Sequence, residues 1–206
     1  MNEFELKISQ EKKNKLFKRC RQDGFSERFL ALKAQEQISD EVGLMQHKEF
    51  ILNAILGEKK NVLLFGDTGI GKTTLALNLA FEIKEKNEDA PVLYNRLNMI
   101  VSAYKANFSN LQTAINSIFK RDSYYSNVGL MNNKLVIIDE VHRCDDYLLL
   151  SEIILTAYDS LTPLILIGNE NVAEFGKKID AMVFSRLKEN SIIINTNNLK
   201  DLRVKK

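Results

Sequence analysis

Residues 66 to 73 read Gly-Asp-Thr-Gly-Ile-Gly-Lys-Thr and match the pattern GxxxxGK[ST] at every fixed position. The apolar run Asn61–Phe65 precedes the match, and a helical pattern from Lys72 to Lys86 follows it. This order of strand, loop and helix is the context in which the pattern is specific. Glycines let successive N–H groups of the loop turn toward phosphate oxygens, and the start of the helix adds positive potential. The stretch therefore predicts a phosphate-binding loop.

The pattern assigns roles to the residues of this loop. We expect the Lys72 ammonium to reach the β- and γ-phosphates of ATP and the Thr73 hydroxyl to bind Mg²⁺. The residues expected to hold the nucleotide are Gly66, Asp67, Thr68, Gly69, Ile70, Gly71, Lys72, Thr73 and Thr74. ATP and Mg²⁺ are thus the predicted cofactors.

Four more apolar runs alternate with helical patterns after the loop. They are residues 92–94, 134–138, 164–167 and 191–195. Such alternation is typical of parallel strands that are buried on both faces. The sequence predicts an α/β P-loop fold with a five-stranded parallel sheet sandwiched by helices. Its ligand site is expected at the carboxyl ends of the strands.

Two carboxylates follow the apolar run 134–138, in the order Leu135-Val-Ile-Ile-Asp139-Glu140. This is a Walker B pattern, in which Asp139 is expected to hold Mg²⁺ opposite Thr73. Glu140 is expected to polarise the attacking water, which favours hydrolysis over phosphoryl transfer to a small molecule. His142 turns the segment into Asp-Glu-Val-His, a weak match to the DExH box of helicases. We interpret it as a surface or supporting histidine.

Length and composition indicate one soluble domain. The chain has 206 residues, of which 45% are hydrophobic and 27% charged, and its net charge is +2. Cys20 and Cys144 fit no metal-ligand spacing and are expected to be free thiols. No signal-peptide pattern and no apolar run of about 20 residues occurs. We therefore expect a cytoplasmic protein without a membrane partner.

Two units are expected along the chain: a basic N-terminal arm or short helix over residues 1–25, and the ATPase core over residues 26–206. The arm carries a basic cluster of Lys12, Lys13, Lys15, Lys18, Arg19 and Arg21. Three readings of this cluster stay open. It is a solvated helix face, a surface that binds a helicase or another partner, or a DNA-contacting arm.

From about Ser26 to Arg203 the chain resembles AAA+ helicase loaders of the DnaC/DnaI type and the related transposition ATPases of the IstB type. The similar segments are Ser26-Glu-Arg-Phe29, Leu93–Ile100 with Ala106-Asn-Phe108, Leu150–Ile154, Thr162–Asn169, Phe184-Ser-Arg-Leu187 and Asp201-Leu-Arg203. The chain departs from the family at Ala157, where arginine is usual, and at Gly168, where serine is common. The resemblance implies an AAA+ core without a large C-terminal lid.

The resemblance also implies three further site residues. Asn169 would be the sensor that orients the hydrolytic water. Arg186 would be an arginine finger that acts on a neighbouring subunit, so the active form would be a homo-oligomer. Such fingers can be worth roughly 10³–10⁵ in rate. Arg203 would be a second sensor within its own subunit.

The function predicted from this resemblance is ATP-driven delivery of a replicative DNA helicase to single-stranded DNA. A candidate DNA patch combines Tyr104, Lys105, Lys120, Arg121, Tyr124 and Tyr125, since charge and stacking both favour single strands. Two alternatives stay open. One is a transposition helper ATPase of the IstB type. The other is a small P-loop kinase or a nucleotide switch that acts without DNA.

Overall fold

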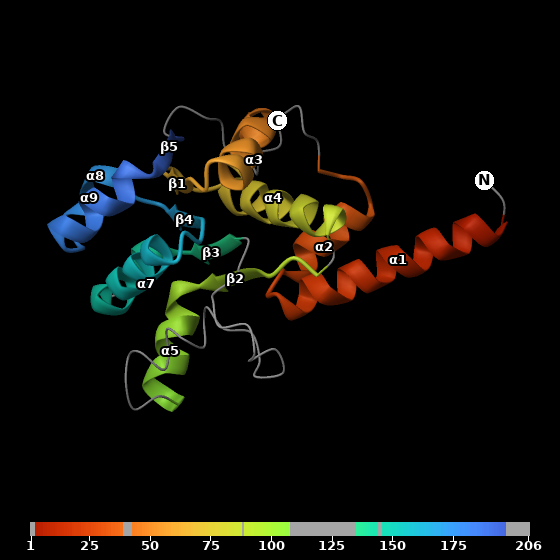
Figure 1. Cartoon of the computed structure of the whole chain (residues 1–206), viewed down its shortest axis with the longest axis horizontal. Helices are drawn as coiled ribbons and strands as arrows, with labels where there is room; N and C mark the ends of the chain where they lie inside the picture. The colour runs from red at the N-terminus through yellow and green to blue at the C-terminus, as the bar shows by residue number, and fades with distance from the viewer. Residues whose placement is uncertain (1–2, 39–42, 88, 108–134, 144–145, 197–206) are drawn as a thin grey trace.

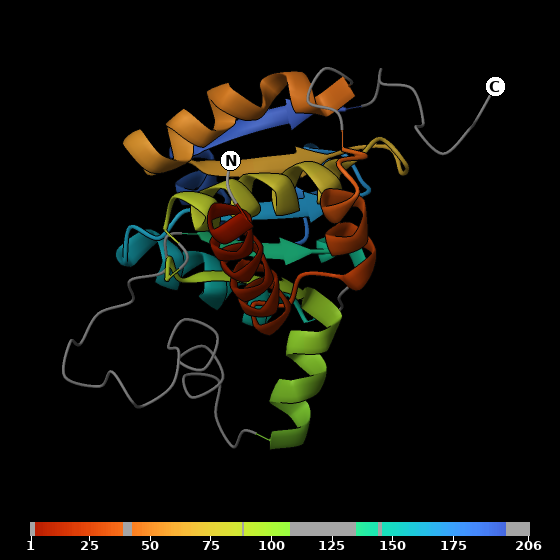
Figure 2. The same ribbon diagram turned by 90° about the vertical axis from the view of Figure 1, so that its right-hand side faces the viewer.

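The computed structural model describes residues 3–38, 43–87, 89–107, 135–143 and 146–196. Five parallel strands form one sheet in the order β2-β3-β4-β1-β5. The strands are β1 Asn61–Phe65, β2 Val92–Arg96, β3 Leu135–Asp139, β4 Leu164–Gly168 and β5 Ser191–Asn195. Figure 2 shows their arrowheads pointing the same way. The predicted five-stranded parallel sheet is confirmed.

Alternate residues of the inner strands enter two separate hydrophobic cores. Val62 and Leu64 of β1 belong to the first core, whereas Leu63 and Phe65 belong to the second. Every residue of β1, β3 and β4 is buried. This is the burial expected of parallel strands that helices cover on both faces.

Helices cover both faces of the sheet (Figures 1 and 2). On the first face lie α1 Glu3–Gln22, α2 Glu27–Ala34, the 3₁₀ helix η1 Gly43–His47, α3 Lys48–Gly57 and α4 Lys72–Lys86. On the second face lie α5 Leu97–Asn107, the 3₁₀ helix η3 Val141–Arg143, α7 Tyr147–Asp159, α8 Val172–Gly176 and α9 Ala181–Glu189. The predicted sandwich is therefore present. Within the described ranges, no helix combines the length and the apolar character that crossing a membrane requires.

The N-terminal helix α1 is part of the first core over its last turns. Leu16, Phe17 and Cys20 are buried there, and the Phe17 ring meets the Phe81 ring of α4 edge-on at a centroid distance of 5.5 Å. Burial raises the pKa of the Cys20 thiol to about 11, so this thiol stays protonated at neutral pH. The first half of α1 extends away from the domain (Figure 1). The division of the chain at residue 25 stays a prediction.

The glycine at position 168, where the family resemblance expects serine, has a packing reason. Gly168 ends β4 and pairs with Phe65 of β1. A Cβ atom at this position would come within 2.6 Å of the Phe65 ring. That ring cannot move freely, because it packs against Phe175 at a centroid distance of 4.9 Å. A large side chain on β1 therefore takes the space that a side chain on β4 would need.

We predict that Gly168→Ala lowers the free energy of unfolding by about 1–3 kcal/mol, the usual cost of overpacking a core. Urea unfolding would measure it. Gly57→Ala is the matched control, since a Cβ at Gly57 meets nothing within 4 Å. In the Phe65→Leu background, Gly168→Ala should lower the free energy of unfolding by less than it does in the wild type. Equal effects of Gly168→Ala in both backgrounds would contradict the explanation.

Candidate functional site

Three glycines give the loop between β1 and α4 its curvature. Gly66, Gly69 and Gly71 have φ angles of 121°, 86° and 91°, which glycine adopts without strain. Gly71 is the N-cap of α4 and makes no side-chain cap hydrogen bond. The N–H groups at the start of a helix carry positive potential, so this end of α4 suits a phosphate oxygen.

The Lys72 side chain folds back onto this loop. It is 5% exposed, and its Nζ donates hydrogen bonds to the carbonyl oxygens of Gly66 at 2.8 Å and Asp67 at 2.5 Å. These bonds hold a cation beside the amides that the glycines turn. The arrangement fits the phosphate-binding role that the sequence predicts for Lys72.

The other residues of the predicted loop differ in their exposure to solvent. Asp67 and Thr68 are exposed at its tip. Ile70 is buried in the first core, so its side chain anchors the loop and only its backbone can face a ligand. Thr74 is half-buried in the first turn of α4.

The Asp139 carboxylate joins three segments at the carboxyl edge of the sheet. Its Oδ2 accepts hydrogen bonds from the Thr73 hydroxyl at 2.8 Å and from the Tyr94 hydroxyl at 2.9 Å. Its Oδ1 accepts from the backbone N–H of Glu140 at 2.7 Å. Magnesium prefers hard oxygen ligands of this kind. The two predicted metal ligands, Thr73 and Asp139, are thus in contact and fit a magnesium ion.

Sequence reasoning missed Tyr94. It lies on β2, is 7% exposed, and points its hydroxyl at the predicted metal ligand. Burial raises the pKa of Tyr94 well above its usual value, and the negative charge of Asp139 raises it further. The phenol therefore stays a hydrogen-bond donor. The only signal in the sequence was a polar-tipped aromatic residue near the end of a strand, which becomes informative once β2 is known to lie beside β3.

Glu140 follows Asp139 in an unusual backbone conformation. Its φ is +58°, a left-handed value that is uncommon for residues other than glycine and that clusters at active sites. Its Oε1 lies 3.4 Å from Nη1 of Arg143. The pKa of Arg96 is raised, first by its hydrogen bond with Tyr94 and then by the charge of Glu140. Arg143 therefore contacts the predicted water-activating carboxylate, and Arg96 interacts with it through charge.

Asn169, the predicted sensor, contacts His142. It directly follows β4, and its backbone N–H donates to Nδ1 of His142 at 3.2 Å. The Asn169 side-chain amide lies 3.2 Å from Nε2 of the same ring. Burial lowers the pKa of His142, and the neighbouring charge of Arg143 lowers it further. Of the two interpretations of His142, a surface or a supporting histidine, its contact with Asn169 fits the second.

The predicted finger, Arg186, lies apart from these residues. It is on α9, whose residues Val183 and Leu187 belong to the second core, whereas α4 covers the first face of the sheet. The Arg186 guanidinium carbon lies 5.6 Å from the centre of the Tyr158 ring on α7. Arg203 lies outside the described residues.

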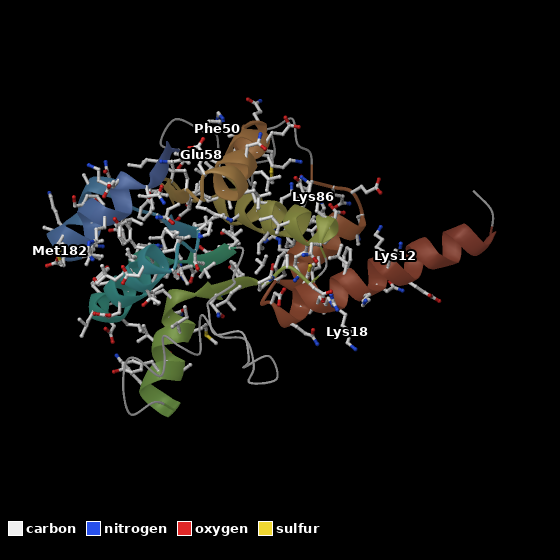
Figure 3. The ribbon with its side chains drawn as sticks, in the orientation of Figure 1. Lys12, Lys18, Phe50, Glu58, Lys86 and Met182 are labelled. Atoms are coloured by element: carbon white, nitrogen blue, oxygen red, sulfur yellow. The ribbon has the colours of Figure 1, made fainter. Side chains whose placement is uncertain are left out.

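A groove of about 920 Å³ lies between α1, α2 and the C-terminal end of α4. Lys12 and Lys86 border it and are labelled in Figure 3. Other lysines also line it, and its floor includes Leu16, Phe17 and Phe81. Since the phosphate loop precedes α4, the groove is separated from it by the length of that helix. Most of the candidate DNA patch lies outside the described residues, which include only Tyr104 and Lys105 of it.

The model of the AAA domain family matches residues 58–197, more than half of the chain. The chain belongs to the AAA domain family. The matched range contains the phosphate loop, Asp139, Glu140, Asn169 and Arg186. No curated protein matches this chain.

Solved structures resemble this AAA domain at low sequence identity. The structure of DnaI has a TM-score of 0.58 and 13% identity, over 82% of this chain and 89% of that one. The DnaC helicase loader has a TM-score of 0.54 and 18% identity, over 74% and 88%. AMPPCP-bound DnaA from Aquifex aeolicus has a TM-score of 0.54 and 16% sequence identity, and the likeness covers 77% of this chain and 47% of that one. The chain thus spans about half of that DnaA chain, and these likenesses concern the fold.

We predict that Tyr94→Phe weakens divalent-metal binding about tenfold, because loss of a residue that orients a metal ligand typically costs 10–100-fold in affinity. The measurement is a Mn²⁺ titration of the protein with ADP, followed by electron paramagnetic resonance. Tyr104→Phe on α5 is the matched control. Equal Mn²⁺ affinity in the wild type and Tyr94→Phe would contradict the role of this hydroxyl.

Proposed function

We propose that this AAA domain binds and hydrolyses ATP with Mg²⁺. The observation that carries the proposal is the contact between Thr73 and Asp139, which places two oxygen ligands beside the phosphate loop. Lys72 and the first amides of α4 would hold the phosphates. When bound, the metal supplies positive charge that stabilises the transferring phosphoryl group.

Glu140 is proposed to act as the base that polarises the attacking water. A positioned carboxylate contributes typically 10²–10⁴-fold to such a step. Arg143 forms an ion pair with this carboxylate in the described conformation. Asn169, one strand away on the carboxyl side of β4, would orient the same water or the γ-phosphate.

Arg186 is proposed to complete the site of a neighbouring subunit. Its helix covers the second face of the sheet, and its guanidinium rests over the Tyr158 ring. Stacking of this kind holds a long, flexible side chain in one place. The active species would then be a homo-oligomer in which each site contains residues of two chains.

For the biological role, we propose delivery of a replicative DNA helicase to single-stranded DNA. The support is the resemblance of the segments from Ser26 to Arg203 to helicase loaders, together with the fold shared with DnaI and the DnaC helicase loader. The chain covers more than four fifths of both of those structures, so the shared fold extends over most of each.

The lysine-lined groove bears on the role of the N-terminal arm. Its aromatic residues, Phe17 and Phe81, are 9% and 2% exposed. Bases of single-stranded DNA are bound by exposed aromatic rings, which this groove does not offer among its described residues. This weighs against base stacking in the groove, while its lysines still suit either an acidic protein surface or the phosphates of DNA. A solvated helix face remains the third reading.

The IstB-type transposition helper is the second candidate function. The same family resemblance supports it, and it differs in the partner, a transposase, and in the DNA, which would be double-stranded. A small P-loop kinase or nucleotide switch without DNA is the candidate of another class. It would use Lys72, Thr73 and Asp139 but would not need Arg186.

We predict that Glu140→Gln binds ATP but hydrolyses it at least about 100-fold more slowly, because the general base is lost. The trapped ATP state should retain its partner in a pull-down from host cells. Mass spectrometry then identifies a helicase, a transposase or neither. Lys72→Ala is the control that should bind neither nucleotide nor partner. Recovery of no helicase with the ATP-bound variant would contradict helicase loading.

We predict that Arg186→Ala and Lys72→Ala are each inactive alone and restore activity when mixed. Random mixing leaves about a quarter of the subunit interfaces with both working groups, so about a quarter of the wild-type rate should return. Steady-state ATP hydrolysis measures this. Lys188→Ala, on the same helix, should retain full activity. Full activity of Arg186→Ala alone, with a mixture that shows only the share of that variant, would place the site within one chain.

A further inference from the structure

His142 is held in place next to the predicted sensor. It lies in η3, whose Val141 is buried in the second core. The backbone N–H of Arg143 donates to the carbonyl oxygen of Glu140, which closes this short turn. The imidazole is thereby directed toward the residue that follows β4, and both of its ring nitrogens lie 3.2 Å from atoms of Asn169.

The two contacts determine which ring nitrogen carries the proton. The backbone N–H of Asn169 can only donate, so Nδ1 of His142 must be an unprotonated acceptor. In a neutral imidazole the proton is then on Nε2, which becomes a donor. The ring atom that meets the Asn169 side chain is therefore an N–H group.

The protonated Nε2 in turn determines the orientation of the side-chain amide. An N–H group and an NH₂ group cannot both donate to each other. The stable arrangement turns the amide so that its Oδ1 accepts from Nε2–H and its NH₂ group points away from the ring. Asn169 then presents a donor, and no acceptor, on the side that the histidine leaves open.

We propose that His142 is a positioning residue that orients the Asn169 amide so that its NH₂ group donates to the γ-phosphate of ATP. This inference rests on the proposed function, in which Asn169 lies near that phosphate. It goes further by naming the residue that sets the amide and the atom that faces the nucleotide. An oriented donor binds a terminal phosphate that ADP lacks, so the pair discriminates ATP from ADP.

The first experiment measures nucleotide discrimination without turnover. Isothermal titration gives the Kd of AMPPCP and of ADP for the wild type, His142→Ala, Asn169→Ala and the double variant. We expect the preference for AMPPCP to fall about tenfold in Asn169→Ala, as for the loss of one hydrogen bond to a charged group. His142→Ala should lower it by several-fold, and the double variant should match Asn169→Ala. His47→Ala, which changes the only other histidine, is the control and should keep the wild-type preference.

The outcomes separate this inference from the proposed function. A normal preference in His142→Ala, with a reduced one in Asn169→Ala, overturns the positioning role alone. A normal preference in Asn169→Ala overturns the positioning role together with the proposed contact between Asn169 and the γ-phosphate, whereas ATP binding by Lys72 and Thr73 is tested separately by the Kd of AMPPCP. Thermal melting of each variant checks that it is folded. Asn169→Asp keeps an acceptor for Nε2–H but has no NH₂ group, and it should lose the preference as Asn169→Ala does; if it retains the preference, the amide orientation is wrong.

The second experiment observes the ring directly. Long-range ¹⁵N–¹H correlation spectra of the full chain distinguish the two neutral tautomers of histidine, and His47→Ala leaves His142 as the only histidine signal. We expect the tautomer with the proton on Nε2 at neutral pH. A proton on Nδ1, or on both nitrogens, would overturn the assignment.

Discussion

The carboxylate of Asp139 is the point at which the parts of the site are joined. It ends β3, and it accepts hydrogen bonds from α4, from β2 and from the next peptide of its own chain. The strand order makes this possible, since β3 lies between β2 and β4 and its carboxyl end faces the loop before α4. A buried carboxylate without such donors would carry a large desolvation cost. The site therefore depends on three elements reaching one side chain.

The N-terminal helix is linked to this same point through β2. The carbonyl oxygen of Asp23 accepts from the backbone N–H of Tyr94, and the Asp23 carboxylate forms a buried ion pair with Lys84 of α4. Gly24 has a φ of +90°, and a Cβ there would lie 2.2 Å from the Tyr94 carbonyl oxygen. Only glycine allows so close an approach. The turn after α1 thus supports the strand that carries Tyr94, which explains why the end of this helix packs as part of the core.

The strands and the phosphate loop could be predicted because each depends on neighbouring residues. Asn61–Phe65 and Ser191–Asn195 are strands with the predicted bounds. The strand order was beyond the sequence, since it depends on pairing between distant segments. The role of Tyr94 was missed because its partner, Asp139, lies 45 residues away in the sequence. His142 was left without a partner because Asn169 lies 27 residues away. Leu16, Phe17 and Cys20 are spaced as on one face of a helix, but the lysines around them made this buried face hard to recognise in the sequence.

The proposed role of Arg186 constrains how copies of this chain can associate. The group that would act in trans belongs to α9 on the second face of the sheet, whereas the phosphates would be held at the start of α4 on the first face. A head-to-tail contact joins two different surfaces. It would meet this requirement by placing the α9 side of one copy against the phosphate loop of the next. Repeating such a contact generates a ring or a helical filament. Each nucleotide would then contact residues of two subunits, so the exchange of ATP for ADP would change the contacts of both.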